Sequence, residues 1–91
     1  MSHATKGRKR YIFRLTAPEA AEVCICGDFN CWNPQKHHLK RKPGGFWEKA
    51  IMLQPGRYEY KFKVDGNWFI DPANNQFCDN NFGTRNNVIV V

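Results

Sequence analysis

Aromatic and apolar side chains occupy every second position between Tyr58 and Val64, and charged side chains occupy the positions between them. This period of two predicts a strand with one face on a core and the other in water. Asp65-Gly66 follows at once and favours a two-residue hairpin turn, because both central residues of such a turn take positive φ. The segment 67–70 is then the short returning strand, and the rest of the chain is expected to pack against this hairpin.

Shorter apolar patterns predict further strands at residues 11–15, 22–26, 38–40, 46–53 and 87–91. Turn residues separate these segments, and no long segment has a convincing helical period. About seven short strands at this spacing predict an all-β, immunoglobulin-like sandwich. Residues 71–85 are predicted to form a long polar loop.

Two of these strands carry more specific expectations. Trp47, Ile51 and Leu53 share one parity and are expected to face the core. Lys49 interrupts that alternation, which suggests an edge position or a bulge. The unbroken apolar run that ends at Val91 suggests burial on both faces.

The length of 91 residues and the hydrophobic content of 42% indicate one folded domain. We expect residues 10–91 to form it and residues 1–9 to be a flexible basic leader. No apolar run approaches the roughly 20 residues that cross a bilayer, and no segment resembles a signal peptide. The chain is therefore expected to be cytoplasmic and to have no membrane partner.

The net charge of +6 raises the possibility of a nucleic-acid partner. The basic residues gather in the leader and in one predicted loop between Lys36 and Lys42. Such segments are most simply solvated and flexible. We expect no nucleic-acid partner, although a nucleic-acid binder stays an alternative that steep salt dependence would reveal.

The four cysteines, Cys24, Cys26, Cys31 and Cys78, do not follow the spacing of a structural zinc site. Cys24 and Cys26 project from one face of a predicted strand, as small buried hydrophobes do. Reduced, buried thiols are the favoured interpretation, with a metal site or a disulfide as alternatives. No metal and no cofactor are expected.

Two of the three tryptophans stand outside the predicted core. Trp32 lies in a loop rich in Asn and Pro, and Trp68 stands just past the Asp-Gly turn. Each ring is either a lid over the core or an exposed platform. Exposed indoles suit sugars, because a pyranose packs its C–H face on an aromatic ring while polar groups bind its hydroxyls. Lys61, Thr84, Asn86 and the Asn-rich loop are candidates for those polar groups, although each of the three named residues also has a purely structural interpretation.

Four motifs in order then suggest a family. They are G-D-F-N-x-W at 27–32, P-G-R-Y-E-Y-K-F-x-V-D-G-x-W at 55–68, D-P at 71–72 and F-G-T-x-N-N at 82–87. Together they resemble the family-48 carbohydrate-binding modules, which include the glycogen-binding domain of the AMP-activated protein kinase β subunit and the N-terminal domains of branching and debranching enzymes. The resemblance covers nearly all of residues 10–91.

The resemblance implies an immunoglobulin-like sandwich that binds α-1,4-glucans such as glycogen, starch or maltooligosaccharides. Trp32 and Trp68 match the two tryptophans that cradle the sugar, and Lys61 matches the family's sugar-contacting lysine. Thr84 and Asn86 match polar contacts of the final loop. Phe82 replaces a leucine that enters the curve of the ligand, which is a departure that bears on selectivity for chain curvature or branching.

The sequence favours a binding module over an enzyme. The acidic residues lie mostly in turns or beside lysines, no catalytic motif occurs, and glycoside hydrolysis needs two carboxylates across a cleft. A larger enzyme or kinase assembly is a further possible partner. The alternative is a protein-interaction module on the same fold, which buried or distant Trp32 and Trp68 would favour.

Overall fold

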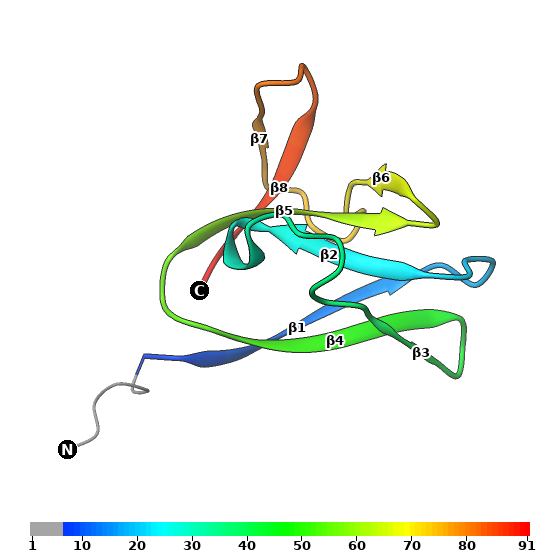
Figure 1. The fold of residues 1–91 in the computed structure, drawn as a ribbon. Coiled ribbons are helices and arrows are strands. Elements are labelled where there is room, and N and C mark those ends of the chain that lie inside the picture. The colour runs from blue at the N-terminus through cyan, green and yellow to red at the C-terminus, as the bar shows by residue number, and fades with distance from the viewer. Residues whose placement is uncertain (1–6) are drawn as a thin grey trace.

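Two antiparallel sheets form the two layers of the fold in the computed structural model, which describes residues 7–91. Figure 1 shows β1, β4 and β3 in one layer and the sheet built around β5 in the other. The elements are β1 (Lys9–Thr16), β2 (Val23–Gly27), the 3-10 turn η1 (Asp28–Asn30), β3 (Lys40–Lys42), β4 (Phe46–Leu53), β5 (Arg57–Val64), β6 (Asn67–Phe69), β7 (Phe77–Asp79) and β8 (Arg85–Val90). The all-β sandwich is therefore confirmed. Residues 1–6 of the predicted leader lie outside the described residues.

Strand β5 is the centre of the second sheet and pairs with β2, β6 and β8. The predicted hairpin is confirmed, because Asp65 and Gly66 have φ of 49° and 85° and join β5 directly to β6. The Asp65 carboxylate also accepts hydrogen bonds from the backbone N–H groups of Ala21 and Glu22 at 2.9 and 2.8 Å. The turn therefore also ties the chain ahead of β2 to this sheet.

The first sheet places β4 between β1 and β3. The register of β1 on β4 runs without interruption from Lys9 opposite Leu53 to Thr16 opposite Phe46, so the bulge suggested at Lys49 is absent. Although β4 is the central strand, β3 pairs with it only at residues 46–48, so the edge suggestion holds only on one side of Lys49, while β1 pairs with it on the other. The strand expected at 38–40 instead begins at Lys40, and the loop ahead of it meets β2 by a single bridge between His38 and Cys24.

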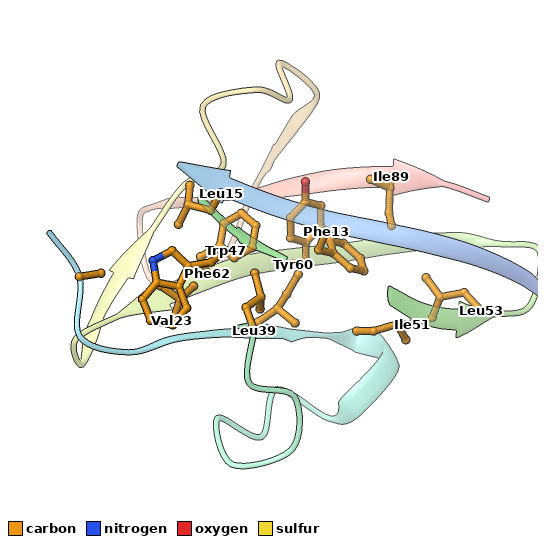
Figure 2. Close-up of a cluster of buried hydrophobic side chains, with 12 residues drawn as sticks. Phe13, Leu15, Val23, Leu39, Trp47, Ile51, Leu53, Tyr60, Phe62 and Ile89 are labelled. Atoms are coloured by element: carbon orange, nitrogen blue, oxygen red, sulfur yellow. The ribbon is translucent and has the colours of Figure 1, made fainter. Parts of the chain in front are cut away.

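The core lies between the layers and is built on aromatic rings, as Figure 2 shows. Phe13 of β1 meets Tyr60 of β5 edge to face, with ring centroids 5.1 Å apart. Trp47 is buried, as predicted, and its indole N–H donates to the carbonyl oxygen of Ala17 at 2.9 Å. Burying one large apolar side chain contributes about 1.5–3 kcal/mol, so this cluster dominates the stability of a chain this short.

The C-terminal third differs from the sequence-based expectation in two ways. The sequence predicts a polar loop at residues 77–79, but these residues form the strand β7, which pairs with β8. Residues 7–91 therefore form eight strands, one more than the sequence predicts. Strand β8 is not buried on both faces: Asn87 and Ile89 face the core, whereas Val90 is exposed. Three-residue β7 was missed because Asn-rich neighbours hide its pattern, and pairing with β8 makes it a strand.

All four cysteines are free thiols. Cys24 and Cys26 are buried, as predicted, and burial raises the pKa of Cys26 to about 11. The same expectation is wrong for Cys31, which is exposed on the loop after η1, and Cys78 is half-buried. Among residues 7–91, no group of His, Cys, Asp or Glu side chains is arranged to hold a metal ion. No helix within those residues is long and apolar enough to cross a membrane.

Gly27 marks the closest approach of β2 to β5. Its φ of −169° is extended and open to any residue, so conformational freedom is not the reason for glycine here. A Cβ at this position would lie 2.6 Å from the carbonyl oxygen of Glu59 and 2.8 Å from the Cβ of Tyr60. Glycine is required because the space is already filled.

We expect Gly27→Ala to lower the free energy of unfolding by about 2 kcal/mol or more, because backbone atoms of β5 would have to move. Gly66→Ala is the matched comparison: its φ is positive but no atom lies within 4 Å of an added Cβ. That change should cost only about 1 kcal/mol of conformational strain. Urea unfolding of both variants measures the difference, and an equal or larger loss at Gly66 would contradict the packing argument.

Candidate functional site

A groove of about 720 Å³ crosses the outer face of the second sheet. Its walls come from the loop after η1, from β5, from β6 and from the hairpin of β7 and β8, which in Figure 1 rises away from the sheet. All six residues that the sequence nominated line it, although they come from four separate segments: Trp32, Lys61, Trp68, Phe82, Thr84 and Asn86.

The two indoles lie next to each other. The ring centroids of Trp32 and Trp68 are 6.3 Å apart and their planes are inclined by 66°. Trp68 is 49% exposed and Trp32 is half-buried, so both rings remain accessible from the groove. They are platforms at the rim, and neither ring is a lid over the core.

Trp32 is held by a strained turn and by β5. Cys31 and Trp32 both have the left-handed backbone conformation, with φ of 56° and 58°, which costs a non-glycine residue about 1–2 kcal/mol each. The Trp32 indole N–H donates to one oxygen of the Asp28 carboxylate at 3.1 Å. The other oxygen accepts from the backbone N–H of Glu59 at 2.8 Å, so Asp28 ties the indole to the sheet.

Trp68 is positioned by the hairpin that the sequence predicts. It lies opposite Lys63 in the register of β5 and β6, which puts both side chains on the outer face. The Lys63 ammonium lies 4.9 Å from the centroid of the Trp68 ring, a cation–π contact. One ring face is thereby occupied by Lys63.

Lys61 forms part of the floor of the groove. The side-chain alternation predicted that it would face water, but it is only 8% exposed because the neighbouring loops cover this face. Its ammonium donates to the hydroxyl of Thr84 at 3.0 Å, and none of the ion pairs found in residues 7–91 includes it. An ammonium has three N–H donors, so donors remain for a ligand.

Asn80 organises the loop between β7 and β8. Its side-chain oxygen accepts from the backbone N–H groups of Phe82 and Thr84 at 2.9 and 3.1 Å. Its amide group donates to the Asn86 side-chain oxygen at 2.9 Å. This wrapped loop leaves the Phe82 ring 89% exposed at the groove. The sequence analysis included Asn80 only as part of the Asn-rich loop, yet Phe82, Thr84 and Asn86 each form a hydrogen bond with its side chain.

Glu59 completes the polar wall of the groove. One carboxylate oxygen accepts from the Asn86 amide at 3.0 Å and the other from the Arg57 guanidinium at 2.9 Å. The hydrogen bond from Asn86, followed by that from Arg57, lowers the pKa of Glu59. The carboxylate is therefore ionised at neutral pH and acts only as an acceptor.

Sequence reasoning missed the groove residue Glu59, and it included Asp79, Asn80 and Asn81 only as part of the Asn-rich loop, without naming them. Glu59 was detectable in principle, since it shares the parity of Lys61 on the alternating strand. The other three stand in an Asn-rich stretch where nothing local separates a ligand-facing amide from a turn former.

Comparison with known proteins identifies the family. The family model described as the glycogen recognition site of AMP-activated protein kinase matches residues 11–91. The chain belongs to this family. The match includes all the strands of the sandwich beyond the first two residues of β1, together with the whole groove. As a member of this family, the chain is a glycogen-recognition module.

Curated relatives agree with this membership. The chain is 35% identical over 72 residues to Protein PTST homolog 2, chloroplastic, of Arabidopsis thaliana, which covers 79% of this chain and 13% of that protein. It is 35% identical over 82 residues to Protein FLOURY ENDOSPERM 6, chloroplastic, of Oryza sativa subsp. japonica. This alignment covers 90% of this chain and 15% of that protein. A 1,4-alpha-glucan branching enzyme of Rhodopseudomonas palustris is 36% identical over 63 residues. This alignment covers 69% of this chain and 9% of the enzyme. The chain thus spans a small fraction of each relative.

We expect Asn80→Ala to loosen the loop of residues 80–84 while the sandwich stays folded, because the change removes the acceptor of two backbone N–H groups. Amide hydrogen exchange followed by NMR should show faster exchange at Phe82 and Thr84. Asn81→Ala removes a similar side chain from the same loop and should leave those rates unchanged. Unaltered protection in Asn80→Ala would show that the loop is held by other contacts.

We expect Asn86→Ala to raise the pKa of Glu59 toward the ordinary value of 4.5, since its first hydrogen-bond donor is lost. Because the pKa of Glu59 is lowered in the native protein, the ionised carboxylate stabilises the fold at pH values above 4.5. This stabilisation is lost as the pH falls through the pKa of Glu59 in the folded protein. Carboxyl-carbon NMR titration measures the shift, with Asn81→Ala as the control. A lower or unchanged pKa in Asn86→Ala would contradict the assignment.

Proposed function

We propose that this groove binds α-1,4-glucans without cleaving them, with Trp32 and Trp68 as stacking platforms and Lys61, Thr84 and Asn86 as polar partners. The observation that carries the proposal is the pair of accessible indoles, 6.3 Å apart and inclined by 66°. The groove also matches the concave, partly aromatic character of carbohydrate sites.

The inclination of the two rings favours a curved chain. Successive glucose units of an α-1,4-glucan turn relative to one another, so their apolar faces follow an arc. A β-1,4-glucan is a flat ribbon and presents parallel faces, which two rings inclined by 66° do not match. We therefore propose that neighbouring glucose units stack on Trp32 and Trp68 in turn.

The polar part of the groove supplies directional contacts to sugar hydroxyls. Lys61 donates one N–H to Thr84 and has others for a ligand, and the ionised Glu59 holds the Asn86 amide in place. Phe82, exposed at the rim, adds a third apolar surface where the resemblance expects a leucine. A flat, wide ring there favours contact along the chain over entry into a tight curve.

The state of Glu59 in the groove supports a non-catalytic role. Glycosidases protonate the leaving oxygen with a carboxylic acid whose pKa is raised. Glu59 has the opposite property, because hydrogen bonds to both oxygens lower its pKa. We propose that the chain is not itself an enzyme.

We propose that the module brings a larger chain or assembly to its glucan. This rests on relatives of which it covers only 9–15%, among them a 1,4-alpha-glucan branching enzyme. Buried or distant tryptophans would have favoured the alternative of a protein-interaction module, and Trp32 and Trp68 are neither. The expected cytoplasmic location and the expected absence of a nucleic-acid partner stay predictions.

We expect maltoheptaose to perturb tryptophan fluorescence and to shift the indole N–H signals of Trp32 and Trp68 in NMR spectra. Trp68→Ala should weaken binding at least tenfold, because stacked aromatic surface is lost. Phe77→Ala is the matched control, since it removes an exposed ring outside the groove. A β-1,4-linked oligosaccharide should not bind. Absence of binding up to millimolar maltoheptaose, or equal binding of both sugars, would overturn the proposal.

A further inference from the structure

The outer face of the first sheet, on the side of the sandwich away from the groove, carries an unusual mixture of side chains. Alternate residues of β1 point outward there, namely Arg10, Ile12 and Arg14. Ala50 and Met52 of β4 lie opposite Ile12 and Arg10 in the register. Apolar side chains thus form a stripe within a basic surface.

A hollow of about 280 Å³ lies on this face. Ile12 and Ala50 line its floor, and three basic side chains of this face surround them: Arg10, Lys40 and Lys42. Lys49 also borders the hollow, but it shares the parity of Trp47 and lies opposite Phe13, so its side chain belongs to the other face. Its one acidic residue, Glu48, is engaged by the guanidinium of Arg14, whose Nε lies 3.0 Å from the carboxylate. The three rim cations, Arg10, Lys40 and Lys42, therefore lack a carboxylate partner among the ion pairs of residues 7–91.

The apolar stripe is open to solvent. Ile12 on the edge strand β1 is 42% exposed, and Met52 on the part of β4 that β3 does not cover is 47% exposed. A basic rim around an apolar floor is complementary to an apolar side chain flanked by carboxylates. We propose that this face docks an acidic segment of a partner protein, with an apolar side chain of that segment on Ile12 and its carboxylates on the lysines.

The apolar floor argues against other polyanions. A nucleic-acid backbone gains its affinity from phosphate contacts and would leave the stripe on Ile12 and Met52 uncovered. An acidic peptide satisfies both parts of the surface, since carboxylates meet the cations while apolar surface is buried. Because the hollow and the groove lie on opposite faces of the sandwich, both can be occupied at once, and docking does not depend on glucan binding.

The test uses the full chain and a short fluorescein-labelled peptide in which leucines are flanked by glutamates, with fluorescence anisotropy as the readout. Lys40→Gln with Lys42→Gln should weaken peptide binding about five- to tenfold. The matched control, Lys36→Gln with Arg85→Gln, removes the same charge elsewhere and should have little effect. Ile12→Thr keeps a β-branched residue but removes apolar surface, and should weaken binding about threefold.

Near-UV circular dichroism verifies that each variant is folded. If either the lysine variant or Ile12→Thr does not fold, the other variant still tests the proposal. Loss of binding in both the lysine and the Ile12 variants supports the proposal. Three outcomes would overturn it: no peptide binding, equal loss in the control pair, or no effect of Ile12→Thr. Tighter binding of a single-stranded oligonucleotide or of anionic lipid vesicles than of the peptide would also overturn it.

Discussion

The alternation of side chains along β5 is the constraint on which the rest of the structure depends. Tyr60 and Phe62 face inward and are fully buried, and each residue between inward positions faces out. A shift of one residue in register would exchange the two faces, so the packing of the core also sets which side chains reach the groove. Core and site are therefore two sides of one strand.

Around that rigid strand, the groove is completed by segments held through polar contacts. Asp28 ties the Trp32 indole to the backbone of Glu59, and Asn80 wraps the loop that carries Phe82 and Thr84. Two consecutive residues in the left-handed conformation show where the chain accepts strain to present an indole. The pattern is typical of binding loops on a rigid scaffold.

Much of the architecture could be predicted because its signals are local. The Asp65-Gly66 turn, the core position of Trp47 and the alternation of β5 each follow from a few neighbouring residues. Short elements such as β7 could not be predicted, because three residues carry too little pattern and only pairing with β8 makes them a strand. The exposed Val90 was misjudged because an apolar run does not reveal which face lacks a neighbour.

The sequence by itself determined the class of the fold, the family and the six nominated groove residues, since periodicity, turn chemistry and ordered motifs are written along the chain. Only the tertiary structure decided that Lys61 is covered, that Asn80 holds the loop, and that the two outer faces of the sandwich differ in character. The physical reason is distance along the chain. Burial and hydrogen bonding in the groove depend on segments that only the packing of two sheets brings together.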